Sequence, residues 1–479
     1  MHRKTKIVCT IGPASSSMEK LNALINAGMN VARLNFSHGA NSDKLEIISR
    51  IKEIRKKMGR NIGILQDLSG PKIRVGDLPE TGLYLQADSL VQLIPGIKCP
   101  EKSEIPTIPV NYPNLLQDVP DSARILLDDG LLELHVEEHA PAGLNCRVIY
   151  GGLLKSHKGL NFPDLILSER APTPKDMEDL KFGIKQGVDF VALSFVQSAA
   201  DIMAVTEEIK KAGAQISVIA KLERGAALKN LDSILEVSDG VMVARGDLGI
   251  ETDLSMIPIY QKLILRRSNQ KGVFTITATQ MLDSMMRNPL PTRAEVTDVA
   301  NAIYDGSDAI MLSGETAAGA YPVEAVHRMR TVADHVEENL GLDRGWVREE
   351  EEKADYSTEM AVAQSVCKAA EQLDSACIVA HTISGKTAKL ISMHRPGKPI
   401  IAITPLKSTY YQLSLVWGIE TILLPEFEND FLKTTAKGDK ALLEQGYVQE
   451  GDLVVISAGI PASETGGTNV MKLHVVGRN

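Results

Sequence analysis

The chain has 479 residues, of which 44% are hydrophobic and 24% charged, and its formal net charge is -9. At roughly 150 residues per domain this length predicts about three domains, and the acidic balance argues against nucleic acid as a partner, because that needs a clustered basic surface. No apolar run is long enough for a signal sequence or a membrane span. The five cysteines have no CxxC spacing and indicate neither a zinc site nor a disulfide framework, so we expect a soluble protein of the reducing cytoplasm.

Eight short apolar runs alternate with segments whose apolar residues recur at helical spacing. The predicted strands cover 6–12, 30–38, 61–68, 188–196, 216–223, 240–247, 273–280 and 308–315. This alternation is typical of an α/β chain folded as a (β/α)8 TIM barrel, whose active site lies at the carboxyl ends of the strands. Those ends carry Arg33, Asn35, Ser37, Asp67, Lys221, Glu223, Asp247, Thr279 and Glu315. We expect the first and fourth strands to be mainly structural.

The barrel pattern covers 1–71, breaks, and resumes over 165–338. In between, 82–87, 89–95, 125–136 and 145–152 alternate apolar and polar residues at period two, and Asp129-Gly130 indicates a hairpin turn. We therefore expect an inserted β-rich domain over 72–164. Because the third strand–helix loop opens at the catalytic end, this domain would cover the site as a lid that excludes water. The alternative is a solvent-exposed insertion that has no functional role.

The last part of the chain predicts a separate domain. The charged segment 338–357 indicates a helical or solvated connector. An amphipathic helix follows over 357–373, and strands are predicted at 376–380, 400–404, 420–424, 453–457 and 471–476. We expect an open α/β domain over 355–479.

Lys221 and Glu223 lie two residues apart in one predicted strand, so both side chains point to the same face. With Asp247 ending the next strand, Glu223 offers two carboxylates, the ligands that Mg²⁺ takes when waters and substrate complete its shell. Lys221 beside such a metal would stabilise negative charge on a transferring phosphoryl group or an enolate. The alternative is that Lys221 and Glu223 form a purely structural ion pair. The presence of Asp247 makes this alternative less favoured.

The same alternation places Arg33, Asn35 and Ser37 on one face. The planar guanidinium of Arg33 matches phosphate oxygens, which predicts a phosphoryl-binding role. The Gly246-Asp247 step lets backbone amides approach an anion, although alone it is weak evidence. Thr279 would supply a hydroxyl to a carboxylate or to a proton-carrying water; an isolated threonine is more often structural.

Seven strings of this chain resemble pyruvate kinase, and their order and spacing cover essentially the whole sequence. They are RLNFSHG, GPKIRVG, KLERG, VMVARGDLGIE, TATQML, NPLPTRAEVTDVANAIYDGSDAIMLSGETAAGAYPVEAV and GGTN. The resemblance implies a barrel with an inserted β lid, a C-terminal regulatory domain and a homotetramer. It also implies Mg²⁺-dependent phosphoryl transfer from phosphoenolpyruvate to ADP, which gives pyruvate and ATP in the last step of glycolysis.

Carried over by motif position, the resemblance assigns Mg²⁺, with Mn²⁺ as a substitute, to Glu223 and Asp247, and catalytic roles to Lys221, Arg33 and Thr279. The substrate-binding residues that it implies are Arg33, Lys221, Gly246, Asp247, Thr279 and Ser313, and a water held by Thr279 and Ser313 is the suggested proton donor. The nucleotide-binding residues that it implies are Asn35, Ser37, His38 and Arg74.

Two positions depart from the family pattern. Many pyruvate kinases have Glu where this chain has Lys72 in GPKIR, and that Glu helps to form a monovalent-cation site. Lys72, near Asp67, would supply an internal charge there, so we predict activity without added K⁺; an exposed lysine without this role is the alternative. The family's lid usually has a Lys-Lys-Gly step, whereas this chain has Ser156, His157, Lys158 and Gly159. Both His157 and Lys158 are candidates to meet the nucleotide.

Residues 381–387 follow a predicted strand and open a helix, whose unpaired amides favour an anion. The segment is not a Walker A loop, because position 380 is Ala. By resemblance, it would join 463–469 in a pocket for a phosphorylated sugar or nucleotide effector; an ordinary helix cap is the alternative. The effector-binding residues so implied are Thr382, Ser384, Gly385, Lys386 and Thr387.

Two other functions fit part of the pattern. A Mg²⁺-dependent barrel lyase or aldolase acting on an enolpyruvate would share the carboxylates and Lys221, but it has no need of a lid or of nucleotide contacts such as Arg74. A catalytically silent metabolite sensor would need only the C-terminal pocket, which leaves the polar strand ends unexplained.

Overall fold

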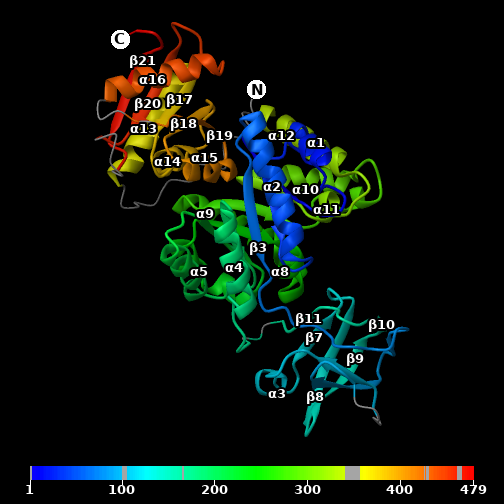
Figure 1. Ribbon diagram of the computed structural model, residues 1–479. Helices are drawn as coiled ribbons and strands as arrows, with labels where there is room; N and C mark the ends of the chain where they lie inside the picture. Colours follow the sequence, from blue (N-terminus) through cyan, green and yellow to red (C-terminus); the bar gives the residue numbers. More distant parts are fainter. Residues whose placement is uncertain are drawn as a thin grey trace.

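The computed structural model describes residues 3–99, 105–163, 165, 167–339, 357–425, 427, 431–460 and 467–478. It has three parts in a row: a β-rich lid, a central barrel, and an α/β domain at the opposite end of the barrel (Figure 1). Most of the predicted connector 338–357 lies outside the described residues. Among the helices of the described ranges, none combines the length and the apolar character that a membrane span requires.

Eight parallel strands close the barrel in the order β1-β16-β15-β14-β13-β12-β3-β2. They are β1 (Lys6–Thr10), β2 (Val31–Asn35), β3 (Gly63–Leu68), β12 (Phe190–Leu193), β13 (Ser217–Leu222), β14 (Gly240–Ala244), β15 (Phe274–Ala278) and β16 (Ala309–Leu312). Each lies inside one of the eight predicted segments, which confirms the predicted barrel. The strands are shorter than the apolar runs because several site residues lie just beyond the strand ends.

Helices cover the outside of the barrel. They are α1 (Met18–Ala27), α2 (Asn41–Met58), α4 (Pro174–Gln186), α5 (Ala199–Lys211), α6 (Gly225–Lys229), α7 (Leu231–Val237), α8 (Arg245–Glu251), α9 (Ile257–Lys271), α10 (Arg293–Tyr304), α11 (Gly314–Ala317) and α12 (Pro322–Asn339). Local sequence explains several helix starts. Thr173 and Thr292 each cap a helix and accept a hydrogen bond from the amide three residues on, at Asp176 and Glu295.

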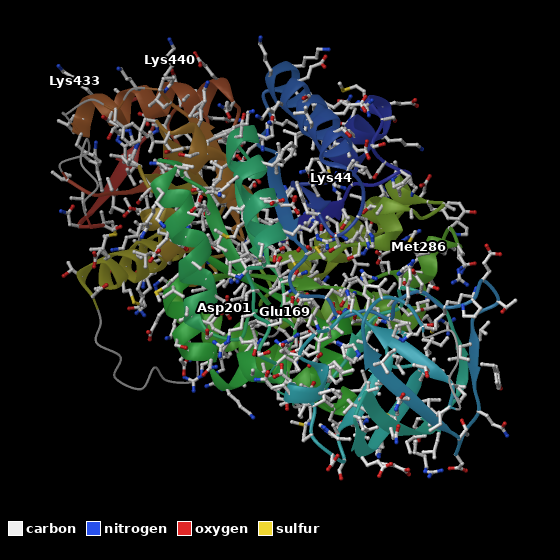
Figure 2. All side chains as sticks on the ribbon, turned by 60° about the horizontal axis from the view of Figure 1, so that its bottom comes forward. Lys44, Glu169, Asp201, Met286, Lys433 and Lys440 are labelled. Atoms are coloured by element: carbon white, nitrogen blue, oxygen red, sulfur yellow. The ribbon has the colours of Figure 1, made fainter. Side chains whose placement is uncertain are left out.

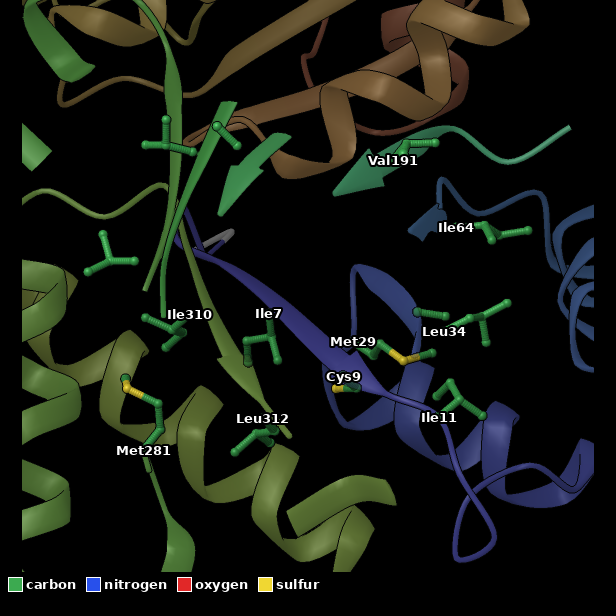
Figure 3. Packing of buried hydrophobic residues seen from close by; sticks show 14 of the residues in the cluster. Ile7, Cys9, Ile11, Met29, Leu34, Ile64, Val191, Met281, Ile310 and Leu312 are labelled. Atoms are coloured by element: carbon green, nitrogen blue, oxygen red, sulfur yellow. The ribbon is translucent and has the colours of Figure 1, made fainter. Parts of the chain in front are cut away.

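The strand period of two divides the barrel core into two layers. Outward-facing side chains such as Ile7, Cys9 and Leu312 pack against the surrounding helices (Figure 3). Inward-facing side chains include Phe190 and Phe274 at the amino ends of their strands, whose rings pack edge to face with centroids 6.1 Å apart. The inward positions are therefore apolar at the amino ends, and they become polar at the carboxyl ends, where the candidate site lies.

The C-terminal domain closes the amino-terminal end of the barrel. Leu413 and Leu415 belong to the same buried cluster as the inward-facing barrel residues. The approach is close, since a Cβ atom on Gly63 would lie 2.6 Å from Ser414 Oγ. Arg395 pairs with Asp308 at 3.2 Å across the same junction. The barrel and this domain therefore share one continuous core.

The lid contains a six-stranded sheet, β11-β7-β8-β9-β5-β6, and the two-stranded sheet β10-β4. Its elements are β4 (Leu83–Leu85), β5 (Leu90–Pro95), β6 (Thr107–Val110), α3 (Leu115–Asp118), β7 (Arg124–Leu127), β8 (Leu132–Ala140), β9 (Gly143–Tyr150), β10 (Gly152–Leu154) and β11 (Leu160–Asn161). The predicted hairpin joins β7 to β8, and Asp129 and Gly130 both have positive φ, of 57° and 85°. The inserted β-rich domain is thus confirmed as a fold.

The C-terminal domain has an open sheet in the order β19-β18-β17-β20-β21, of which only β21 is antiparallel. Its elements are α13 (Thr358–Gln372), β17 (Cys377–His381), α14 (Lys386–Met393), β18 (Ile400–Thr404), α15 (Lys407–Gln412), β19 (Ile419–Leu423), α16 (Phe431–Glu444), β20 (Leu453–Ala458) and β21 (Val470–Val475). α16 is amphipathic: Leu442 is buried, while Lys433 and Lys440 project outward (Figure 2). The predicted open α/β domain is confirmed.

Candidate active site

Four side chains of alternating charge lie in contact at the carboxyl end of the barrel. Arg33 donates from Nε to Asp67 Oδ2 at 2.6 Å, and its Nη2 lies at the same distance from that oxygen. The Nζ atom of Lys221 lies 3.1 Å from Asp67 Oδ1 and 3.0 Å from Glu223 Oε1. All four side chains are buried. Lys221 and Glu223 thus share a face, as their spacing predicted.

The cluster determines the charge of its members. Burial alone would raise the pKa of Asp67, but Arg33 and Lys221 outweigh burial and hold that pKa below its usual range. Burial alone would lower the pKa of Lys221, but the carboxylates of Asp67 and Glu223 raise that pKa above its usual range. Lys221 is therefore a permanent cation at neutral pH, which suits it to stabilise negative charge rather than to accept a proton.

The charge of Asp247 affects the ionisation of Glu223. Burial raises the pKa of Glu223; the charge of Asp247 raises it too, and Lys221 opposes both. A carboxylate whose ionisation is opposed by a neighbouring carboxylate is suited to bind a divalent cation. The described residues contain no cluster of three or more His, Cys, Asp or Glu ligands. A metal held by this pair would take its other oxygens from water or substrate.

The secondary structure around Asp247 differs from the prediction. The strand was expected to run to Asp247, but β14 ends at Ala244, and Asp247 lies in the first turn of α8. The alternation of apolar residues does not distinguish the last strand residue from the first helical turn, because Leu248 is buried in either case. The carboxylate still acts electrostatically on Glu223.

Gly246 and Thr279, both predicted to bind the substrate carboxylate, lie in contact, since the Gly246 amide donates to Thr279 Oγ1 at 2.8 Å. Thr279 has φ of 70°, a strained conformation for a β-branched residue. Arg245, which the sequence reasoning missed, donates to the Thr279 carbonyl at 2.9 Å and forms two 2.7 Å hydrogen bonds with Asp298. Arg245 therefore supports the strained backbone of Thr279. Its place in the sequence, between the predicted strand and Gly246, could have identified it as a residue of the site.

Two hydroxyl residues of the site were also missed. Thr10, at the end of β1, accepts a hydrogen bond from Arg33 Nη1 at 2.7 Å. Ser194, directly after β12, accepts one from Lys221 Nζ at 2.7 Å. The expectation that the first and fourth strands are mainly structural was therefore wrong, because both contact the charged cluster. Their inward position at a strand end was the signal that could have identified them.

The predicted nucleotide residues of the barrel lie near a positive part of the lid. Asn35 Oδ1 accepts a hydrogen bond from the Ser37 amide at 3.0 Å. Burial lowers the pKa of His38, and the charges of Arg74 and Lys72 lower it further. Lid and barrel thus place several cationic or polar groups within electrostatic reach of one another.

Lys72 lies at the base of the lid, and among the described residues no ion pair joins it to Asp67. Its side chain is exposed and lines a pocket between lid and barrel, while the oxygens of Asp67 contact Arg33 and Lys221. Lys158 Nζ pairs with Asp128 at 2.8 Å.

His157, the other lid candidate, has φ of 63°, and its Nε2 lies 3.5 Å from Asp77. Its carbonyl accepts a hydrogen bond from Arg74 Nη1 at 2.9 Å. His157 thus orients the one lid residue that the family motif assigns to the nucleotide.

Glu315 and Ser313 follow β16. The Ser313 amide donates to Glu315 Oε2 at 2.7 Å, and the Leu282 amide donates to Glu315 Oε1 at 3.0 Å. The buried Glu315 carboxylate therefore holds the backbone at Leu282 and Ser313. Within the described residues, Ser313 and Thr279 share no hydrogen bond.

The predicted effector segment forms the loop between β17 and α14. Gly385 has φ of 83°, and its amide donates to Thr382 Oγ1 at 3.0 Å. Lys386 pairs with Glu359 at 3.0 Å, and Thr387 shares a 2.8 Å hydrogen bond with Thr468. Ser384 lies in the same loop. Of the second predicted loop, 463–466 lie outside the described residues.

Comparisons with known proteins agree across the chain. The family model described as "Pyruvate kinase, barrel domain" matches residues 2–326, and "Pyruvate kinase, alpha/beta domain" matches residues 360–474. A protein of Geobacillus stearothermophilus named "Pyruvate kinase" is 46% identical over 481 residues, which cover 99% of this chain and 81% of that protein. A protein of the same name from Staphylococcus aureus is 45% identical over 487 residues, with the same coverage.

Proposed function

The chain belongs to the pyruvate kinase family, and we propose that the polar carboxyl end of its barrel binds phosphoenolpyruvate, ADP and Mg²⁺ through the residues predicted for them. As a member of this family it is a phosphotransferase, which transfers the phosphoryl group of phosphoenolpyruvate to ADP and gives pyruvate and ATP. The observation that carries the site proposal is the buried cluster of Arg33, Asp67, Lys221 and Glu223.

The cations of the cluster bind and stabilise the anionic substrate. Arg33, held by Asp67, presents its guanidinium to the phosphoryl group. Lys221 remains charged and stabilises the negative charge that develops on the enolate oxygen as the bond from phosphorus to that oxygen breaks. The Gly246 amide, which donates to Thr279 Oγ1 at 2.8 Å, and the Thr279 hydroxyl would exchange this bond for hydrogen bonds to the substrate carboxylate. A water held by Thr279 and Ser313 supplies the proton to the enolate carbon.

Glu223 and Asp247 would hold the divalent metal, Mg²⁺ or in its place Mn²⁺. The raised pKa of Glu223 beside Asp247 supports this assignment, because a cation between them would relieve the repulsion. The metal when bound supplies positive charge that neutralises the phosphoryl oxygens. Lys221 and Phe195 already orient the Glu223 carboxylate, at 3.0 and 2.7 Å.

The nucleotide phosphates would meet Asn35, Ser37 and His38 from the barrel and Arg74 from the lid, with His157 or Lys158 as a further lid contact. Lid closure would exclude water from the transfer. We propose activity without K⁺, with Lys72 as the internal charge. Support comes from its electrostatic effect on His38, one of the residues proposed for the nucleotide, because the charge of Lys72 lowers the pKa of that histidine. The orientation of the lid would determine which group pairs with the Lys72 ammonium.

We further propose allosteric control through the C-terminal domain, a homotetrameric assembly and a cytoplasmic location. The effector would be a phosphorylated sugar or nucleotide bound by Thr382, Ser384, Gly385, Lys386 and Thr387. Support comes from the position of these residues at the amino end of α14, where unpaired amides favour phosphate.

A coupled lactate dehydrogenase assay with phosphoenolpyruvate, ADP and Mg²⁺ tests the site. We expect pyruvate only when ADP is present, whereas a barrel lyase would not require ADP and a silent sensor would form none. Glu223→Gln should abolish most turnover. Glu236→Gln is the matched control, because Glu236 pairs with Lys271 at 3.1 Å outside the site. Equal activity of both variants would contradict the metal assignment.

A further inference from the structure

A direct hydrogen bond joins the lid to the barrel below the proposed metal site. Asn161, on the lid strand β11, donates from Nδ2 to Glu251 Oε1 on α8 at 2.8 Å. Figure 1 shows β11 at the lid edge nearest the barrel and α8 at the barrel edge nearest the lid. Glu251 is 5% exposed. Because a buried carboxylate is costly without partners, this contact is a specific attachment of the lid.

Glu251 is mechanically linked to Asp247. The two carboxylates lie four residues apart in α8 and therefore on the same helical face, one turn apart. They also interact electrostatically, since the charge of Asp247 contributes to raising the pKa of Glu251, after burial as the largest cause. A lid residue that holds Glu251 thus holds the helical turn that carries Asp247.

Arg224 places a second charge at this junction. It follows Glu223, and because side chains alternate along an extended segment it points away from the inward-facing Glu223. Arg224 is 6% exposed, lies over the Phe195 ring at 5.1 Å, and lines the same pocket as Asn161 and Glu251. Its Nε and Nη1 atoms have no hydrogen-bond partner among the described residues. The charge of Arg224 already opposes the effect of burial on the pKa of Glu251, so the guanidinium lies within electrostatic reach of Glu251 and its two unpartnered nitrogens can pair with that carboxylate when the lid moves.

Each proposed metal carboxylate thus has a neighbour in the chain at the base of the lid: Arg224 beside Glu223, and Glu251 one turn from Asp247. We propose that Asn161 and Glu251 are positioning residues, which hold α8 so that Asp247 stays beside Glu223 when the lid is seated. When the lid leaves, Glu251 exchanges its Asn161 partner for Arg224, and the metal pair loosens. This inference rests on the proposed role of Glu223 and Asp247 as metal ligands.

Equilibrium Mn²⁺ binding, measured by electron paramagnetic resonance with phosphoenolpyruvate present, tests the inference directly. Asn161→Ala should weaken Mn²⁺ binding about tenfold, because a hydrogen bond to a charged group is lost. The apparent Mg²⁺ activation constant in the coupled assay should rise by a similar factor. Asn145→Ala is the matched control: Asn145 makes the same kind of bond, Nδ2 to Glu138 Oε1 at 2.9 Å, entirely within the lid. It should bind Mn²⁺ like the wild type.

Three further variants protect the test from a simple folding defect. Glu251→Gln keeps an oxygen acceptor for Asn161 and should retain most of the Mn²⁺ affinity, whereas Glu251→Ala should not. Asn161→Asp keeps the shape of the side chain but opposes Glu251 with a like charge, so it should bind Mn²⁺ more weakly than Asn161→Ala at an unchanged melting temperature.

If Asn161→Ala and Asn161→Asp both bind Mn²⁺ within twofold of the Asn145→Ala control, the positioning role is refuted. A wild-type protein that binds no Mn²⁺ would instead overturn the metal assignment itself.

Discussion

Replacing Asp67 with asparagine tests the charged cluster on which the proposed site depends. Asp67 is 1% exposed and contacts two cations, Arg33 at 2.6 Å and Lys221 at 3.1 Å. Asparagine keeps the shape of the side chain, so no cavity forms, but the two cations lose their shared counter-charge. Breaking a buried ion pair by removing one partner costs about 3–5 kcal/mol.

At about 2.1 cal/mol/K per residue, the entropy of unfolding of this 479-residue chain is roughly 1 kcal/mol/K. Asp67→Asn should therefore lower the melting temperature by about 3–5 °C. Glu46→Gln is the control, because Glu46 forms an exposed pair with Arg50 at 2.5 Å, and such pairs contribute about 0.2–1 kcal/mol. Calorimetry at neutral pH with and without inorganic phosphate provides the measurement.

Phosphate should restore part of the lost stability of Asp67→Asn, because an anion that binds only the folded state can replace the missing charge. The wild type should gain less from phosphate, since its cations already have a counter-charge. A loss of stability no larger than that of Glu46→Gln would refute the reasoning. So would an equal effect of phosphate on the variant and on the wild type.

Three further predictions concern the lid base and the C-terminal domain. Lys72→Glu should make turnover depend on added K⁺, measured in buffers free of Na⁺ and K⁺; undiminished turnover there would contradict the internal-charge proposal. Glu359→Ala should free Lys386 from its 3.0 Å pair and tighten binding of a phosphorylated effector, measured as a shift in phosphoenolpyruvate saturation; Lys386→Ala should abolish the shift. Burial lowers the pKa of His381 to about 4 against the charge of Asp439, from an ordinary value of 6.5. The folded state therefore takes up fewer protons, and stability should fall as pH drops from about 6.5 to about 4; in His381→Leu, urea midpoints should lose this dependence.

The barrel and the pairing of Lys221 with Glu223 were predictable because both follow from short-range periodicity. A period of two determines which strand residues face inward, and parallel strands bring their carboxyl ends together. The hydroxyls of Thr10 and Ser194 were not predicted, since a threonine or serine at a strand end has the same local pattern whether it faces a charged cluster or the core. Their roles depend on which strands become neighbours.

The position of Lys72 could not be derived from local pattern either. It lies on the segment that joins the barrel to the lid, so its distance from Asp67 depends on the orientation of a whole domain. That orientation is set by contacts far apart in the sequence, such as Asn161 with Glu251. The family motif predicted the chemistry expected of Lys72, but the motif does not specify lid orientation.

The shared core at the amino-terminal end of the barrel has a consequence for synthesis of the chain. Barrel residues such as Phe190 and Phe274 need Leu413 and Leu415 to complete their packing, and these leucines leave the ribosome after all eight barrel strands. During synthesis, the barrel would therefore expose the apolar residues at its amino-terminal end until that late segment emerged. This exposure favours aggregation or chaperone binding in the interval. Truncation before residue 413 should thus impair the yield of folded barrel even though every barrel strand is present.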